Sequence, residues 1–331
     1  MTDDAYPLER WASRLRQLPV KVEGALDHVI GAGNDIAERT VGDGVRIVRA
    51  AGGNHSVHAV HVGERTYCVK QPLPTHRHES NTDRVLLREV GGMFVVADNA
   101  PGRAPLPHHW HSSPAWLLCD WLPGHALGNR QLTDHQITEL ALATKDVSAL
   151  TPENTGEPLW DIDWPIVALV EWQRERHQEL LDRGDQASSE AASLVGDWLA
   201  SDDPALFLEA SDFLVFTRGD QNLANAMWDG DTIRFIDFEY CGWNDLPRDL
   251  SLLTEHIQSY MTPIDAWETY IDQFSLTKRQ RQRTLAGRRR QALSWLTKEC
   301  LNPGALHSWP AENRVELLLD RARHLCHMSP P

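Results

Sequence analysis

Apolar and polar residues alternate along three short stretches in the first quarter of the chain. Residues 44–50 alternate, residues 57–62 alternate again, and Gly63-Glu64-Arg65 turns the chain into a third stretch at 66–71. A period of two residues is typical of half-buried strands. We therefore expect a small antiparallel sheet here, with residues 51–56 as a flexible loop between its first two strands.

The next segments suggest a helix, a loop and a strand. Residues 78–98 carry apolar positions at helical spacing, although Gly91-Gly92 weakens the pattern, and Pro-rich loops follow. Residues 115–122 form a continuous apolar run, typical of a buried strand, that stops at Pro123-Gly124. We place a domain boundary at this dipeptide. The first domain is then residues 1–123, with an N-terminal helix, and the second is residues 124–331.

Helical periodicity dominates the second domain. We expect helices around 133–150, 164–183 and 188–200, and several more from 247 onward. One island of strands interrupts them at 213–216 and 226–238, with Asp229-Gly230 as a hairpin turn. The pattern predicts an α+β fold with a small antiparallel sheet lobe followed by a larger, mainly helical lobe.

Charge and hydropathy exclude several classes of function. The 331 residues carry a formal net charge of −15, which disfavours a nucleic-acid partner because an acidic surface repels phosphate backbones. No run of about eighteen apolar residues is present, and no signal peptide is evident, so we expect a cytoplasmic protein without a membrane partner. The oligomeric state does not follow from the sequence.

Two local features have competing interpretations. The basic run from Lys278 to Arg290 is typical of a solvated helix face, and contact with an anion or with RNA is the alternative. Five cysteines are odd in number and widely spaced, which favours reduced thiols over a disulfide framework or a zinc site.

The strand island contains oxygen-bearing side chains suited to phosphoryl transfer. Asp220 and Asn225 lie on the loop that leaves the first strand, and Asp237 lies at the end of the hairpin. Transfer requires one carboxylate to orient the attacking hydroxyl and further oxygen ligands to hold magnesium against the phosphates. Each residue alone fits an ordinary turn or a strand-end cap. Together they predict a magnesium-dependent kinase.

These motifs identify a family resemblance. The pattern Asp220-x4-Asn225, then residues 236–240 and Asp245-x3-Asp249, resembles the aminoglycoside phosphotransferase and choline kinase superfamily. These small-molecule kinases have a protein-kinase-like, bilobal fold. The resemblance implies that Asp220 is the catalytic aspartate, that Asn225 and Asp237 are metal ligands, and that Asp249 is structural. It also implies ATP, or another nucleoside triphosphate, with Mg²⁺ as cofactors.

The resemblance implies further features upstream, in a nucleotide-binding first domain. Lys70 matches the lysine that contacts the phosphates, and Glu89 matches its helical partner, with Glu79 as a fallback. The backbone from Leu118 to Asp120 is the expected adenine contact. The loop expected to cover the nucleotide contains Gly52, Gly53, Asn54 and Ser56.

One position departs from the family pattern. The family usually has a histidine two residues before the catalytic aspartate, and this chain has Arg218. That histidine braces the loop by hydrogen bonding, and arginine offers more donors for the same purpose. We interpret Arg218 as the brace of a variant subfamily that keeps its activity.

The expected acceptor is a hydroxyl on a small molecule. Eleven residues separate Asp237 from Asp249, too few for the long segment with which a protein kinase docks a polypeptide. The second domain is rich in tryptophan; most of these we expect in the core, and a few could line a pocket for a cationic or sugar ligand. The candidate substrate residues are Glu239, Tyr240, Asp161 and Asp163, although the last two also fit a helix N-cap.

The acceptor class stays open at this level. We expect a cationic amino sugar or aminoglycoside, and an amino alcohol such as choline or ethanolamine is the alternative. A non-catalytic, nucleotide-binding protein on a kinase fold is a second alternative. It is disfavoured because Lys70, Asp220, Asn225 and Asp237 are all present.

Overall fold

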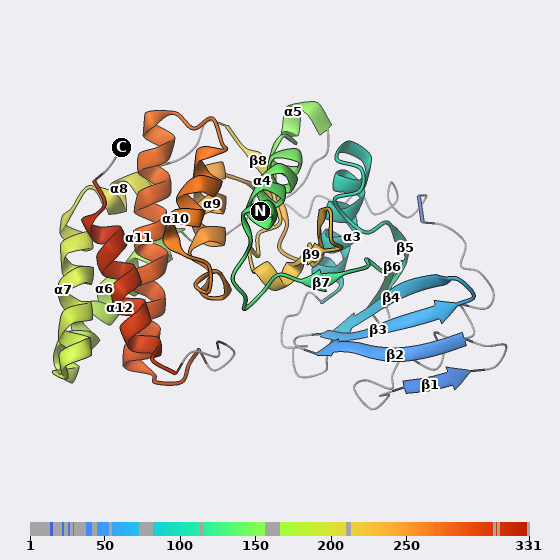
Figure 1. Cartoon of the computed structure of the whole chain (residues 1–331), viewed down its shortest axis with the longest axis horizontal. Helices are drawn as coiled ribbons and strands as arrows, with labels where there is room; N and C mark the ends of the chain where they lie inside the picture. The colour runs from blue at the N-terminus through green and yellow to red at the C-terminus, as the bar shows by residue number, and fades with distance from the viewer. Residues whose placement is uncertain are drawn as a thin grey trace. The chain divides into compact units, whose positions relative to one another are not determined.

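The protein divides into two compact units (Figure 1). In a computed structural model, the described residues are 14–15, 22, 26, 29, 38–41, 45–52, 55–72, 82–112, 115–155, 166–209, 213–306, 309 and 312–329. The first unit is Met1–Gly124 together with Arg234–Cys241, and the second is His125–Ile233 together with Gly242–Pro331. Residues 234–241, placed in the second domain by sequence, thus group with the first unit. The assignment of functions to the two domains stays a prediction.

The first unit contains one six-stranded antiparallel sheet with the order β1-β2-β3-β4-β6-β5. Its strands confirm the predicted alternating stretches and the apolar run, and β1 and β5 are additional strands that the sequence did not predict. Their bounds are β1 (Glu38–Val41), β2 (Val45–Gly52), β3 (His55–Val62), β4 (Arg65–Pro72), β5 (Pro107–Ser112) and β6 (Ala115–Asp120).

The predicted flexible loop at 51–56 is wrong for its described residues. β2 runs through Gly52, β3 begins at His55, and the last paired residues are Gly52 and Ser56. A register shift between Arg49 and Ala51 marks a bulge, which lets the pairing continue past an extra residue. Gly53 and Asn54 lie outside the described residues. Strand pairing therefore replaces most of the expected loop.

Helix α3 (Thr82–Asn99) contacts β5 and β6, and its Gly92 has a packing reason. A Cβ atom added at Gly92 would lie 2.4 Å from Sγ of Cys241, which is closer than atoms approach in proteins. The Cys241 thiol in turn donates to the carbonyl oxygen of Arg88. Glycine inside this helix therefore permits the close approach of residues 234–241, at a cost in helix propensity.

All five cysteines are free thiols, as expected. Two of them are neighbours, which their distance in sequence did not predict: Cys68 of β4 lies opposite Cys119 of β6, and their thiols hydrogen-bond to each other. The hydrogen bond with Cys68, and after it burial, raise the pKa of Cys119, so its thiol stays protonated.

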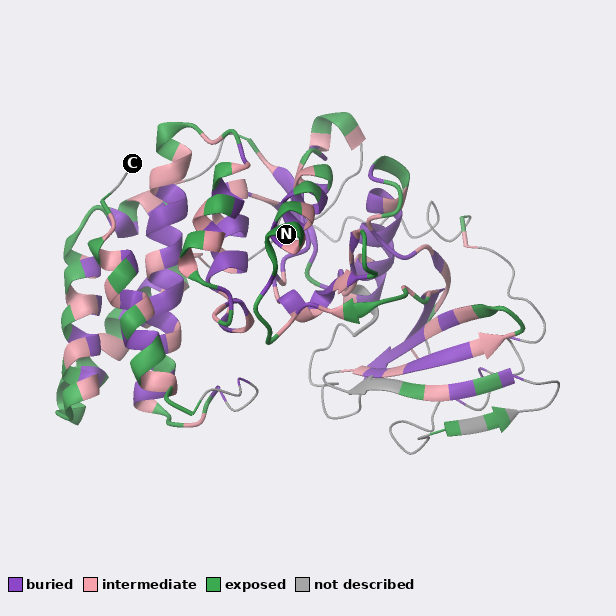
Figure 2. Ribbon diagram, in the orientation of Figure 1, coloured by how far each residue is buried: buried purple, intermediate pink, exposed green. Residues whose placement is uncertain are grey.

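The second unit is built around the long helix α11, which contacts α6, α7, α8, α9 and α12. Figure 2 shows α11 buried along most of its length, whereas α7 and α12 alternate between buried and exposed residues. The bounds are α4 (Asp134–Ser148), α5 (Pro152–Thr155), α6 (Ile166–Arg183), α7 (Gln186–Ala200), α8 (Asp203–Leu208), α9 (Leu246–Thr254), α10 (Ile264–Asp272), α11 (Lys278–Leu301) and α12 (Arg314–His327).

Short strands in this unit frame the loop that contains Asp220. β8 (Val215–Thr217) pairs with β11 (Gly242–Asn244), and β7 (His125–Ala126) pairs with β9 (Ala226–Trp228). β9 continues through the predicted hairpin turn into β10 (Ile233–Phe235). Two 3₁₀ turns follow β8 and α9, at Leu223–Asn225 and Ile257–Ser259. The Asp220 loop is thus fixed by a strand at each end.

The core of the second unit confirms one prediction and corrects another. Most described tryptophans here are buried, namely Trp198, Trp228, Trp243, Trp267 and Trp309, as expected. The basic run at 278–290 is not a solvated helix face, since Arg283, Arg288 and Arg290 are buried. Arg283 pairs with Asp245 at 2.9 Å and Arg288 with Glu255 at 2.8 Å, so buried carboxylates hold these two arginines inside. None of the helices in the described ranges has the length and apolarity of a membrane span.

Candidate active site

Three carboxylates of the first unit gather around one ammonium group, that of Lys70. The Nζ atom of Lys70 donates to both carboxylate oxygens of Glu89, at 3.1 and 2.9 Å, and to Oδ1 of Asp237. The carboxylate of Glu239 lies 3.8 Å from the same nitrogen. We call Lys70, Glu89, Asp237 and Glu239 the lysine cluster. Three carboxylates facing one cation leave a surplus of negative charge.

The fold of the first unit sets the positions of this cluster. Lys70 lies on β4 opposite Leu117 of β6, and Glu89 lies on α3. The backbone N–H of Phe238 donates to the Glu89 carboxylate, which ties residues 234–241 to α3. Asp237 itself has φ +64°, a left-handed conformation that few residues other than glycine adopt. Backbone strain of this kind is concentrated at functional sites.

Burial distinguishes the three carboxylates. The side chains of Glu89 and Glu239 are 1% and 7% exposed, whereas that of Asp237 is 27% exposed. Burial raises the pKa of Glu89 to about 7, against the opposing charge of Lys70. Burial alone would lower the pKa of Lys70, but the surrounding carboxylates outweigh it and raise that pKa well above its ordinary value. Asp237 is therefore the member of the cluster open to a ligand.

Glu239 has a second neighbour in the first unit. Its carboxylate lies 3.4 Å from Nε2 of His55, the first residue of β3. Both side chains are largely buried, at 7% and 12% exposure. This predicted substrate residue thus faces Lys70 and His55, whereas its neighbour Tyr240 is 37% exposed.

The second unit contains a loop at residues 218–225, which we call the Asp220 loop. Gly219 has φ +78°, so glycine suits the sharp turn between β8 and Asp220. Oδ1 of Asp220 accepts from the backbone N–H of Asn222 at 3.0 Å, and Oδ2 accepts from Nδ2 of Asn225 at 3.1 Å. These bonds fix the carboxylate plane, and the amide oxygen of Asn225 then points away from Asp220.

A buried hydrogen-bond chain supports this loop from behind. Arg218 donates to Oε1 of Gln221 at 2.6 Å, and Nε2 of Gln221 donates to Oδ1 of Asp249 at 2.5 Å. All three side chains are buried. Burial raises the pKa of Asp249 to about 7, against the opposing charge of Arg218. Gln221 was not predicted from sequence, although its place next to Asp220 could have suggested it.

His256 is a second neighbour that the sequence did not suggest. Burial lowers its pKa to about 4, while the nearby charge of Asp220 acts in the opposite direction. Its Nδ1 accepts from the backbone N–H of Gln258 at 3.3 Å. The ring next to the Asp220 loop is therefore a neutral imidazole at neutral pH.

The remaining predicted site residues lie either within the sheet of the first unit or outside the described ranges. Leu118 lies in β6 between β4 and β5, and the Asp120 side chain accepts from His108 Nε2 at 2.6 Å. The backbone N–H of Asp120 donates to Leu106, so both residues are engaged within the sheet. Ser56 is buried, and Gly52 ends β2. The residues outside the described ranges are Gly53, Asn54, Glu79, Asp161 and Asp163.

Several solved structures to which this chain is similar are named as kinases of small molecules. Spectinomycin phosphotransferase, solved with ADP and spectinomycin, shares 12% identity with this chain at a TM-score of 0.57; the match covers 90% of this chain and 98% of that one. A choline/ethanolamine kinase family protein from Mesorhizobium loti shares 12% identity at 0.56, over 85% and 88%. Choline kinase LicA from Streptococcus pneumoniae shares 12% at 0.55, over 92% and 99%. These likenesses confirm the predicted protein-kinase-like fold.

A family model gives the assignment at the level of sequence. No curated protein matches the chain at a significant level. The model described as the phosphotransferase enzyme family matches residues 46–289, a span that includes both the lysine cluster and the Asp220 loop. The predicted resemblance is therefore confirmed, and this chain belongs to the phosphotransferase enzyme family.

Proposed function

We propose that the protein transfers the γ-phosphoryl group of ATP, with Mg²⁺, to a hydroxyl of a small molecule. The observation that supports this most is the pairing of Lys70 with Glu89 beside the partly exposed Asp237. In kinases a lysine held by a helix glutamate contacts the nucleotide phosphates, and an aspartate nearby holds the metal. We further propose that the reaction takes place in the cytoplasm.

The oxygen-bearing side chains proposed as ligands fit magnesium. The lysine cluster has more carboxylates than cations, and its exposed member is Asp237. The amide nitrogen of Asn225 is held by Asp220, which leaves the amide oxygen as the ligand atom. Magnesium in phosphoryl-transfer sites takes one or two protein carboxylates together with phosphate oxygens. Asp237 and Asn225 would hold the ion, which when bound neutralises the charge of the phosphates.

Asp220 is the proposed base. In this mechanism its carboxylate accepts the proton of the acceptor hydroxyl as the acceptor oxygen bonds to the γ-phosphorus and the bond to the bridging oxygen of ADP breaks. The two hydrogen bonds from the Asp220 loop orient the carboxylate before the acceptor arrives. Lys70 positions the phosphates, and the neutral His256 leaves the negative charge of Asp220 uncompensated. Positioning and charge supply most of the acceleration.

For the acceptor we propose a cationic amino sugar or aminoglycoside, with a choline- or ethanolamine-like amino alcohol as the alternative. Structures of the same fold are named for both kinds of substrate. The short span between Asp237 and Asp249 favours a small acceptor over a polypeptide. We assign Glu239 to the nucleotide half because it faces Lys70 and His55, which leaves Tyr240 as the described candidate for acceptor contact.

Two tryptophans of the second unit, Trp172 and Trp295, already face cations of the protein. The ammonium of Lys298 lies 4.5 Å from the ring centroid of Trp295 and 5.9 Å from that of Trp172. The guanidinium of Arg176 also approaches Trp172, at 6.0 Å. These cation–π contacts use the indole faces that an amino sugar would need. Recognition of a cationic acceptor is then expected from carboxylates, such as those of Asp161 and Asp163.

The test is a screen for ATP consumption across aminoglycosides, amino sugars and amino alcohols, with Asp220→Ala as the blank. We expect one class to raise Mg²⁺-dependent consumption in the wild type and none to raise it in the variant. Equal consumption by both proteins with every acceptor would contradict the proposal.

A further inference from the structure

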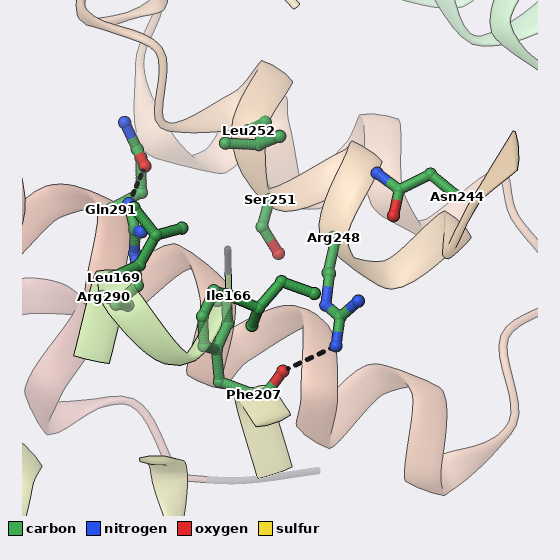
Figure 3. A pocket seen from close by; sticks show the side chains of 10 residues that line it. Ile166, Leu169, Phe207, Asn244, Arg248, Ser251, Leu252, Arg290 and Gln291 are labelled. Atoms are coloured by element: carbon green, nitrogen blue, oxygen red, sulfur yellow. Dashed lines mark hydrogen bonds between the residues drawn. The ribbon is translucent and has the colours of Figure 1, made fainter. Parts of the chain in front are cut away.

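A small cavity inside the second unit has mostly apolar walls (Figure 3). It measures about 30 Å³, and side chains such as Ile166 and Phe207 line it. Arg248 donates to the carbonyl oxygen of Phe207 at 3.1 Å, and Arg290 donates to the amide oxygen of Gln291. Cavities with apolar walls stay empty of polar ligands. A more reactive arrangement of side chains lies in the sheet of the first unit.

Two thiols face each other across neighbouring strands of that sheet. Cys68 of β4 is the register partner of Cys119 of β6, and their thiols hydrogen-bond to each other. Directly opposite residues of an antiparallel pair have Cα atoms about 4.5 to 5.5 Å apart. A disulfide forms between residues whose Cα atoms are about 4.4 to 6.8 Å apart. The backbone therefore already holds the two cysteines at a spacing from which a disulfide can close.

The neighbours of this pair leave room on the same face of the sheet. Ala59 of β3 lies opposite Cys68, so the row across β3, β4 and β6 consists of three small side chains. The next row on this face contains Lys70 and Leu117, because side chains two residues apart on a strand share a face. Cys68 is partly exposed, whereas Cys119 is buried. A small oxidant can therefore reach Cys68, with a second thiol in contact with it.

The two thiols have different roles in an oxidation. The hydrogen bond with Cys68, burial and the nearby charge of Glu89 raise the pKa of Cys119. Cys119 therefore stays a thiol at neutral pH and can donate its hydrogen to the sulfur of Cys68. Thiolates, and not thiols, attack peroxides. The attacking sulfur is then that of Cys68, and Cys119 is the thiol that resolves the product.

We propose that Cys68 and Cys119 are an oxidisable thiol pair that hydrogen peroxide converts into a disulfide. The Cys68 thiolate attacks one peroxide oxygen, and the O–O bond breaks to leave a sulfenic acid and a hydroxide, which takes the proton that Cys68 released. The sulfur of Cys119 then bonds to that of Cys68, and the hydroxyl group leaves with the Cys119 proton as water. Two thiols and one peroxide give one disulfide and two water molecules, so two electrons pass to the peroxide.

The disulfide changes the strand that contains Lys70. An S–S bond of about 2.05 Å is shorter than any contact between two thiols, so oxidation draws β4 and β6 together two residues from Lys70. This consequence rests on the proposed function, in which Lys70 contacts the phosphates and the backbone from Leu118 to Asp120 contacts the adenine. We expect the oxidised protein to bind ATP more weakly, and bound ATP to slow the oxidation.

Oxidation of the full chain tests the proposal directly. The reduced protein is treated with a small excess of hydrogen peroxide, free thiols are blocked with iodoacetamide, and the peptides are identified by mass spectrometry. We expect a Cys68–Cys119 disulfide, with a loss of about 2 Da that dithiothreitol reverses. Two thiols that stay unreacted, or a Cys68 oxidised to the sulfinic acid without a disulfide, would overturn the proposal.

Three variants locate the reaction. Cys119→Ala removes the resolving thiol, so Cys68 should stop at the sulfenic acid, which dimedone labels. Cys68→Ala should leave Cys119 unreacted. Cys326→Ser is the matched control, because Cys326 is the other partly exposed cysteine, and it should form the disulfide as the wild type does. If Cys119→Ala does not fold, Cys119→Ser gives the same readout. A Cys68 that dimedone does not label in these variants would contradict the assigned roles.

Calorimetry with ATP and Mg²⁺ separates this proposal from the proposed function. The reduced protein should bind ATP, and the oxidised protein should bind it about 10-fold more weakly until dithiothreitol restores the affinity. Equal affinity in both states would remove the link between the thiol pair and the nucleotide. A reduced protein that binds no ATP would instead contradict the proposed function, while the disulfide found by mass spectrometry would still establish the thiol pair.

Discussion

The lysine cluster and the Asp220 loop are organised by different forces. The lysine cluster is ionic and buried, with three carboxylates around Lys70. In the Asp220 loop, the carboxylate of Asp220 accepts hydrogen bonds from a backbone N–H and from a side-chain amide. A buried hydrogen bond from Arg218 to Gln221 supports the same loop. The surplus negative charge of this cluster suits a bound cation, and its lysine suits the phosphates that such a cation accompanies. A carboxylate held by two hydrogen-bond donors suits proton transfer, because its direction is fixed.

The largest effect that this comparison predicts is on turnover, when the proposed base Asp220 is replaced. Asp220→Asn should lower kcat by about 10²- to 10⁴-fold, because asparagine cannot accept the hydroxyl proton. Turnover with the acceptor found in the screen gives the measurement. Asp231→Asn, at an exposed hairpin position of the same unit, is the control and should leave turnover unchanged. A kcat within tenfold of the wild type in Asp220→Asn would remove Asp220 from the mechanism.

The next largest effect on turnover is expected when residues of the lysine cluster are replaced. Lys70→Met should lower kcat/KM for ATP by about 10²-fold, because the phosphates lose a cation that stabilises the transition state. Glu89→Gln should cost less, since it loosens Lys70 without removing its charge.

A double-variant cycle sharpens this point. Because Glu89 acts through Lys70, the double variant should be no worse than Lys70→Met alone. Additive losses in kcat/KM would mean that Glu89 contributes independently, and the ionic cluster would not act as one group.

A smaller effect is expected behind the Asp220 loop. Arg218→His should keep kcat within about tenfold of the wild type if Arg218 is a brace, since histidine also donates a hydrogen bond to Gln221. Arg218→Met removes that donor and should lower stability by about 1–3 kcal/mol, measured by urea unfolding. Complete loss of turnover in Arg218→His, with normal stability, would point to direct contact with the substrate.

The smallest effect is on stability alone. Burial raises the pKa of Asp249 to about 7 from an ordinary 3.8, so the folded protein retains a proton that the unfolded chain releases. The stability from this group is complete below about pH 4 and is lost as pH rises toward 7. Asp249→Asn should flatten that slope, which is at most about 1.4 kcal/mol per pH unit. Urea unfolding between about pH 5 and pH 8 measures it.

The control for this measurement is again Asp231→Asn, which should keep the wild-type slope. An unchanged slope in Asp249→Asn would show that Asp249 is ionised in the folded protein across this range.

Local pattern predicted the elements with strong periodicity. Alternation predicted β2, β3 and β4, and helical spacing predicted α3, α4, α6 and α7. It missed β5, whose His-rich segment has no clear alternation, and β11, which has three residues. Such strands form because neighbouring strands pair with them, and that information is not local.

The residues of the candidate site also divide into those that the local sequence predicts and those that only the fold brings together. Spacing and the family resemblance predicted roles for Asp220, Asn225 and Asp237, because these residues lie on one short stretch of chain. The hydrogen-bond chain through Gln221 and the neutral His256 depend on tertiary burial. Burial also places Arg283, Arg288 and Arg290 in the core, although sequence alone interpreted the basic run as solvated. The sequence shows where charged residues lie along the chain, whereas only the fold shows which opposite charge pairs with each of them.

The most direct test of the division between the two regions is ATP affinity, measured by calorimetry with and without Mg²⁺ in three proteins. The wild type and Asp220→Asn should bind ATP equally, each more tightly with Mg²⁺, while Asp237→Asn should lose the magnesium-dependent part. Magnesium-dependent binding that is intact in Asp237→Asn, or lost in Asp220→Asn, would contradict the assignment of nucleotide binding to the lysine cluster and of proton transfer to the Asp220 loop.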